Sequence, residues 1–218
     1  LKNPGCRLVP ADSLGLHDAL GFGGVAVLED AWRRYRLDDV LTGVGDAADR
    51  GRLKAMVFSR LLFPCSKLSL KTRSADSALA AACGLEQCDL DEDRLYEAMD
   101  ALSGKWAGIE KSLYSGAYPE PPTLVLYDLT SSYFDGARDK KLAAYGYSRD
   151  HRADRPQVIL ALATGPDGIP IHMEVLKGNR ADNSTLLPLL ETMRRRFGMA
   201  KAVFSFDGGM SSSLNLEK

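Results

Sequence analysis

The sequence predicts an α/β protein in which an all-α N-terminal domain precedes a mixed sheet with the element order β-β-β-α-β. Three observations support this fold class. Apolar residues recur every three or four positions through the first half of the 218-residue chain, which is helical spacing. Gly116 and three prolines then crowd into residues 116–122, a composition that supports neither a helix nor a central strand. Beyond them, short runs rich in Val, Ile and Leu indicate strands.

Four helices are expected before the proline-rich segment. The second ends before Pro64, the third stops at Gly84, and the fourth follows Asp91, a good N-cap. The fourth also carries its apolar residues alternately four and three apart, so it packs along its length on another element. The predicted helices cover residues 25–41, 53–61, 74–83 and 91–113. The predicted domains are therefore a helical domain over 1–115, a linker over 116–122 and a second domain over 123–218.

Four strands and one helix are expected in the second domain. The second and third strands flank Gly165-Pro166-Asp167-Gly168, a turn-forming tetrad that predicts an antiparallel hairpin. A helix begins near Ser184 or Thr185 and ends in three arginines before Gly198. A strand-helix-strand connection of this length is a right-handed crossover, which places the last strand parallel to a neighbour. The predicted strands are 123–127, 157–164, 169–176 and 200–206.

Composition bounds the function only loosely. There are 28 basic and 29 acidic residues, so the net charge of −1 argues neither for nor against nucleic acid. The four cysteines lack zinc-site or redox spacing, which favours reduced thiols and a cytoplasmic location. The sequence contains no apolar run long enough to predict a membrane span. Both ends of the sequence look cut, so we expect a fragment.

Two aspartates at strand positions are the candidate site. Asp128 has apolar residues on both sides, which predicts a strand buried on both faces and a carboxylate that needs a metal, a cation or donors. Asp207 closes another apolar strand, and glycines follow it. If the crossover makes the two strands neighbours, the like charges require a proton or a cation between them. The alternative for each aspartate alone is a turn residue or a strand-end cap.

Four blocks of the sequence resemble successive blocks of bacterial insertion-sequence DDE transposases, in order and spacing. The blocks are Tyr127-Asp128-Leu-Thr-Ser, Gly146-Tyr-Ser-Arg-Asp-His151-Arg-Ala-Asp154-Arg-Pro-Gln157, Gly178-Asn179-Arg-Ala-Asp182 and Phe206-Asp207-Gly-Gly-Met210. The resemblance covers residues 91–218 and is weaker before residue 91. It implies an RNase H-like, retroviral-integrase-like catalytic core over 123–218.

The resemblance also implies site residues and a cofactor. The first two catalytic acids of that family fall on Asp128 and Asp207, which would bind Mg²⁺ or Mn²⁺. The family's third acid is a glutamate in a Tyr-Arg-Glu-Lys signature beyond an insertion, and nothing in residues 211–218 matches it. The core is therefore expected to be truncated. Three other glutamates are not assigned to this role: Glu174, Glu191 and Glu217.

The function implied is metal-dependent DNA cleavage and strand transfer during transposition of an insertion sequence. In that chemistry one ion activates water or a 3′-hydroxyl and another stabilises the leaving oxygen. The expected partners are double-stranded DNA, as transposon ends and target, and a second copy of the chain on that DNA, in the cytoplasm at the nucleoid. The alternative is a truncated or decayed transposase that binds DNA without cutting it.

Two groups of basic residues are candidates for DNA contact. One lies in residues 50–73, which contain seven basic and no acidic residues, and the other lies between the first two strands. A solvated helix face is the alternative for the first group, and loop hydrogen bonding is the alternative for His151 beside Asp154. Tyr145 and Tyr147 can stack on bases, although loop tyrosines more often pack. The assigned contacts are Arg50, Arg52, Lys54, Lys140, Lys141, Arg149, His151 and Arg152.

Overall fold

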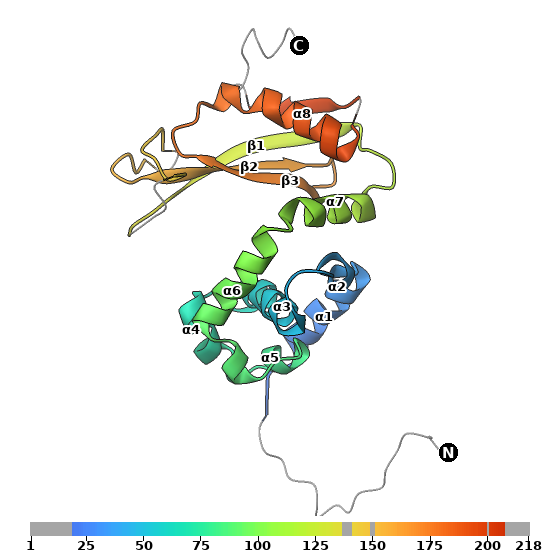
Figure 1. Cartoon of the computed structure of the whole chain (residues 1–218), viewed down its shortest axis with the longest axis vertical. Helices are drawn as coiled ribbons and strands as arrows, with labels where there is room; N and C mark the ends of the chain where they lie inside the picture. The colour runs from blue at the N-terminus through green and yellow to red at the C-terminus, as the bar shows by residue number, and fades with distance from the viewer. Residues whose placement is uncertain (1–18, 137–140, 149–150, 200, 208–218) are drawn as a thin grey trace, which may run out of the picture. The chain divides into compact units, whose positions relative to one another are not determined.

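The chain folds as two compact units, Leu1–Trp106 and Ala107–Lys218 (Figure 1). The computed structural model describes residues 19–136, 141–148, 151–199 and 201–207. The division lies earlier than the linker predicted over 116–122. Its cause is helix α7 (Trp106–Ala117), whose Tyr114 is buried in the core of the second unit. The proline-rich segment therefore lies inside the second unit, between α7 and the first strand.

The first unit is helical; three of the predicted helices are shorter or divided, whereas the one predicted over 53–61 is longer and spans Ala47–Leu62. The predicted helix over 25–41 is two helices, because Arg36 adopts a left-handed conformation with φ 53°. The segment 74–83 forms only a short helix, and the predicted helix over 91–113 breaks after Ser103. The helices are α1 (Gly23–Arg34), α2 (Leu37–Val40), α3 (Ala47–Leu62), α4 (Lys67–Arg73), α5 (Leu79–Ala82), a 3₁₀ turn η2 (Gln87–Asp89) and α6 (Glu92–Ser103).

The second unit is a four-stranded mixed sheet with the strand order β3-β2-β1-β4. Strands β1 and β2, and β2 and β3, pair antiparallel, whereas β4 pairs parallel with β1. The predicted fold class and the order β-β-β-α-β are thereby confirmed, and the arrangement is compatible with an incomplete RNase H-like core. Its elements are β1 (Leu124–Tyr133), β2 (Gln157–Thr164), β3 (Pro170–Lys177), η3 (Asp182–Ser184), α8 (Leu186–Phe197) and β4 (Val203–Phe206).

Only one face of this sheet carries the core. Val125, Tyr127 and Leu129 alternate along β1 and are buried with apolar residues of α8, which lies along the sheet in Figure 1. Leu126 and Leu162 belong to the opposite face, where each is 39 % exposed. The prediction that β1 is buried on both faces is therefore wrong. Apolar side chains occupy both faces, but the described elements cover one.

Helix α7 is attached to the second unit by a buried carboxylate. Glu110 accepts hydrogen bonds from the Met173 amide at 2.9 Å and from Arg196 at 2.6 Å, and its oxygens lie 3.1 Å from Nδ1 of His172. One turn further along α7, the Tyr114 ring lies against the Phe197 ring of α8, with the ring centroids 4.9 Å apart. These contacts join α7, β3 and α8.

Among the described residues, no helix is long and apolar enough for a membrane crossing.

Candidate active site

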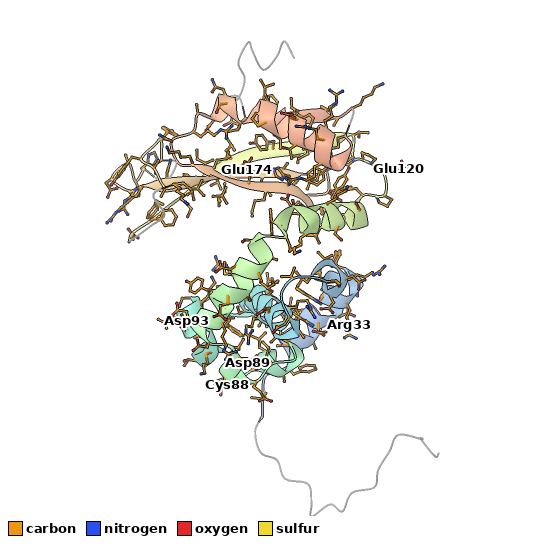
Figure 2. The ribbon with its side chains drawn as sticks, viewed as in Figure 1. Arg33, Cys88, Asp89, Asp93, Glu120 and Glu174 are labelled. Carbon is orange, nitrogen blue, oxygen red and sulfur yellow. The ribbon has the colours of Figure 1, made fainter. Side chains whose placement is uncertain are left out.

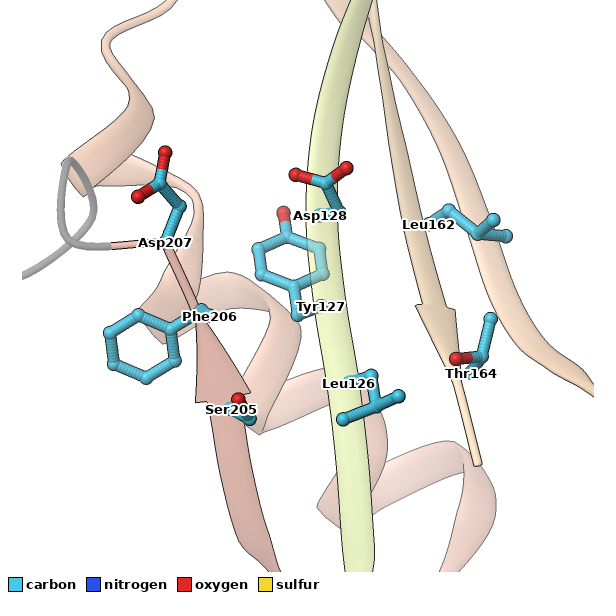
Figure 3. A pocket seen from close by; sticks show the side chains of 8 residues that line it. All are labelled: Leu126, Tyr127, Asp128, Leu162, Thr164, Ser205, Phe206 and Asp207. Carbon is cyan, nitrogen blue, oxygen red and sulfur yellow. The ribbon is translucent and has the colours of Figure 1, made fainter. Parts of the chain in front are cut away.

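The two candidate catalytic aspartates lie side by side. The parallel register pairs Tyr127 of β1 with Phe206 of β4, so Asp128 and Asp207 are the next residues on neighbouring strands. Figure 3 shows both carboxylates at the same end of this strand pair. Both line one open pocket of about 290 Å³. The crossover topology thus produces the juxtaposition that the sequence predicts.

The reason for expecting a cation at Asp128 changes with its placement. The side chain lies on the uncovered face of the sheet and is exposed, so no burial of charge has to be compensated. One carboxylate oxygen accepts a hydrogen bond from the Leu129 amide at 2.8 Å. Asp207 is exposed as well. The case for a cation therefore rests on the closeness of the two carboxylates. Neighbouring strands are about 4.8 Å apart, and two like charges at that spacing attract a cation.

Hydroxyl side chains complete the pocket. Thr164 and Ser205 line it together with the aspartates. Both residues are opposite Leu126 in the register, and directly paired residues project from the same face of a sheet. Neither hydroxyl residue was predicted from the sequence. The signal was available, because Ser205 precedes Asp207 by two positions on one strand and therefore shares its face.

The pocket contains two carboxylates and no third in the part of the chain that the structure describes. No group of three metal-ligating side chains occurs among those residues. Glu174 lies on β3, as Figure 2 shows, and β2 separates it from β1. It is also opposite Ala161, which is opposite Leu129, so it projects from the other face than Asp128. Glu191 forms an exposed ion pair within α8, and Glu217 lies outside the described residues.

The donor set suits a hard divalent cation. Mg²⁺ and Mn²⁺ prefer oxygen ligands, and Mg²⁺ is commonly held by one or two carboxylates while it retains several waters. Asp128 and Asp207 supply two carboxylates, and the open pocket leaves room for water and for a phosphate oxygen. The described residues thus fit such an ion with incomplete protein ligation.

Two residues of the first basic group, Arg52 and Lys54, are buried and paired within the helical unit. Arg52 is 4 % exposed, bonds to Asp49 at 2.9 Å and donates to the Asp89 carbonyl at 3.1 Å. Lys54 is 8 % exposed and lies 2.7 Å from a carboxylate oxygen of Glu29. Their burial corrects the expectation of a solvent-facing basic helix at these two positions, because their charges are neutralised internally. Contact of either with DNA stays a prediction that this placement does not favour.

Arg50 is half-buried and also engaged within the helical unit. Its guanidinium donates to the carbonyl oxygens of Val44 at 3.2 Å and Gly45 at 3.1 Å. These bonds tie the start of α3 to the loop before it. Contact of Arg50 with DNA remains a prediction, as it does for Arg52 and Lys54.

The second group of basic residues lies in the connection between β1 and β2. Lys141 and His151 are exposed, and His151 has a left-handed φ of 56°. Arg152 pairs with both oxygens of Asp154, at 2.9 and 3.1 Å, and lies over the Tyr133 ring. The hydrogen bonds and charge of Asp154 raise the pKa of Arg152. The other two assigned residues, Lys140 and Arg149, lie outside the described residues.

Known proteins show one distant structural likeness to the chain. No protein-family model matches the chain, and no curated protein matches it. Among solved structures, the chain is similar to Mos1 transposase in a paired-end complex with the left transposon end, with a TM-score of 0.30 and 11 % sequence identity. The match covers 76 % of this chain and 55 % of the Mos1 chain. A likeness this distant carries neither fold nor function across.

Proposed function

We propose that this chain is part of a DNA transposase, and that Asp128 and Asp207 hold Mg²⁺ or Mn²⁺ for phosphoryl transfer on DNA. The observation that carries the proposal is the pair itself: two carboxylates on neighbouring parallel strands, lining one open pocket. Four sequence blocks that resemble insertion-sequence transposases support it, and both aspartates fall in the blocks where that family has catalytic acids.

The two aspartates and the open face around them have a place in this reaction. The aspartates orient the cation, which when bound would activate the attacking oxygen and stabilise the leaving one. The Leu129 amide holds one oxygen of Asp128, which restricts the rotation of that carboxylate. The open, uncovered face gives a duplex access to both side chains. A homodimer on transposon ends and target DNA, in the cytoplasm at the nucleoid, remains a prediction from the resemblance.

The test is metal-dependent nicking of plasmid DNA by the full chain. Asp128→Asn and Asp207→Asn should each lower the nicking rate in Mn²⁺ by about a hundredfold or more, because loss of a direct ligand exceeds the effect of an outer partner. The control is the double variant Asp30→Asn, Glu191→Gln. It removes two exposed carboxylates that each pair with an arginine on their own helix, and it should keep the wild-type rate.

The alternative, a DNA-binding protein that does not cut, makes a different prediction in the same assay. The wild-type chain would then retard DNA in a gel without nicking it, at any Mn²⁺ concentration. Nicking by wild type that both aspartate variants retain would contradict the assignment of the pair.

A further inference from the structure

A second cleft lies in the same unit, away from the aspartate pocket. It has a volume of about 400 Å³ and is formed by Tyr147, by Ile159 of β2 and by residues 178–183, which follow β3. We call it the Gly178 cleft. Its size is within the range of small-ligand pockets in proteins. We propose, as an extension of the proposed function on which it rests, that this cleft binds one unpaired nucleobase of the DNA strand.

Hydrogen bonds among buried and backbone groups fix the two walls of the cleft. Gln157 is 1 % exposed, and its amide nitrogen donates to the carbonyls of Tyr147 at 2.7 Å and Gly178 at 2.9 Å. One buried side chain thus fixes both walls. Backbone bonds between Ala144 and Gln157, at 3.0 and 2.9 Å, and from the Gly178 amide to the Leu142 carbonyl at 3.0 Å complete the framework.

Close approach of the two walls explains two glycines. A Cβ at Gly146 would lie 2.2 Å from the Gly178 carbonyl oxygen, and a Cβ at Gly178 would lie 1.9 Å from the Gln157 carbonyl oxygen. Both contacts are with backbone, which cannot move aside cheaply. Neither glycine has a positive φ, so contact rather than backbone conformation requires them. Residues quoted for the transposase resemblance therefore meet at this cleft.

The lining suits an uncharged ring with donors and acceptors. Tyr147 is 81 % exposed, an unusual placement for a large aromatic side chain, and Ile159 provides an apolar wall. Asn179 and Asn183 bring amide groups to the lining. Bases stack on aromatic side chains and hydrogen bond through their edges, and this is how unpaired nucleotides are bound.

The charges of the cleft do not suit a phosphate. The guanidinium of Arg180 is held by Ser184, through Nε to the hydroxyl at 3.3 Å and through Nη2 to the carbonyl at 3.2 Å. Asp182, which also lines the cleft, offsets that positive charge. A neutral lining with an exposed aromatic ring favours a base over the strand's charged backbone.

The cleft lies further along the sheet than the aspartates and on its other face, because Ile159 is opposite Ser131, which shares a face with Leu129 and not with Asp128. Gly178 follows Lys177, which is opposite Val158, and Val158 is opposite Ser132 of β1. From Asp128 to that level of β1 the strand advances roughly 15 Å. At about 3.4 Å per stacked nucleotide, this is a span of a few nucleotides. A strand that reaches both sites passes from one face of the sheet to the other, so its path is longer than this span, and a base bound in the cleft would fix one point of that path.

The test measures binding of a short oligothymidine that carries one central 2-aminopurine, without added metal. Tyr147→Ala should weaken binding by about five- to a hundredfold, the range for loss of one base–aromatic stack. The substitution leaves the framework intact, because Gln157 bonds to the backbone carbonyl of Tyr147. Tyr145→Ala is the matched control. Tyr145 is a neighbouring tyrosine, 62 % exposed, that does not line the cleft, and its removal should change nothing.

A second arm separates the base from the phosphates. The same oligonucleotide with an abasic central nucleotide keeps every phosphate and should bind wild type as weakly as the intact strand binds Tyr147→Ala. Equal affinity for intact and abasic strands, or equal effects of the two tyrosine substitutions, would overturn the proposal. Asp128→Asn should retain base binding, so failure of the metal site and failure of this cleft give different results.

Discussion

Replacing Glu110 by glutamine should destabilise the second unit strongly while barely changing its shape. The carboxylate side chain is 5 % exposed and accepts bonds from the Met173 amide and from Arg196. Breaking a buried ion pair costs about 3–5 kcal/mol. Because the Arg196 side chain is 35 % exposed and stays partly solvated, we expect the lower end, about 3 kcal/mol. Glu191→Gln removes an exposed pair and should cost at most about 0.5 kcal/mol.

Urea denaturation followed by far-UV circular dichroism measures this difference. With a slope near 2 kcal/mol/M, the midpoint of Glu110→Gln should fall by about 1.5 M relative to wild type. Hydrogen exchange at the Met173 amide places the effect in the second unit, because that amide loses its charged acceptor. A midpoint for Glu110→Gln indistinguishable from that of Glu191→Gln would refute the view that this carboxylate attaches α7.

The same cluster gives a pH dependence. Burial by itself would raise the pKa of Glu110, but the hydrogen bonds from His172 and the Met173 amide and the charges of His172 and Arg196 lower it overall. The folded pKa is thus below the ordinary value of 4.5. The stabilisation should therefore be complete above about pH 5 and be lost as the pH falls below 4.5 through the folded pKa. Wild type should lose more stability over that interval than Glu110→Gln.

Two further substitutions test the internal polar groups. Gln157→Leu should lower the free energy of unfolding by about 2–4 kcal/mol, because the carbonyls of Tyr147 and Gly178 lose their donor at a buried site; a loss under 0.5 kcal/mol in a thermal melt would contradict this. Arg52→Ala should destabilise the helical unit by about 3 kcal/mol, since it leaves Asp49 without its buried partner; an unchanged melting temperature would contradict a stabilising role for this pair.

The fold follows from local signals where neighbours in sequence decide it. The tetrad 165–168 predicts the β2–β3 hairpin, and the length of the 177–203 connection predicts that β4 is parallel to β1. The break at Arg36 was not predictable, because the apolar period continues through it; the break after Ser103 had a signal in the turn-forming pair Ser103-Gly104, which the continuing apolar period outweighed. Periodicity reports which face is apolar, whereas tertiary packing decides where one helix ends and the next begins.

Charged residues were harder to place, because their partners are distant in sequence. Arg52 bonds to the carbonyl of a residue 37 positions away, and Arg196 to a carboxylate 86 positions away. Spacing cannot reveal such pairs. One signal was available: Glu110 lies four residues after Trp106 and four before Tyr114, on the apolar stripe of α7, where a carboxylate requires buried partners.

The candidate site was predictable in position but not in environment. Asp128 and Asp207 could be placed together on the condition that the crossover lays the last strand beside the first, because handedness and length make that strand parallel but do not select its neighbour. The exposure of Asp128 could not be predicted. The apolar residues on both sides of it indicate a strand covered on two faces, whereas the described elements cover one face.

The most direct test of the central claim is Mn²⁺ binding to the full chain, measured by titration calorimetry or by the loss of the free-ion electron paramagnetic resonance signal. Wild type and the control double variant Asp30→Asn, Glu191→Gln should bind equally. Asp128→Asn and Asp207→Asn should each weaken binding, and together they should abolish it. Equal binding by wild type and the Asp128→Asn, Asp207→Asn double variant would contradict a shared metal site at these aspartates.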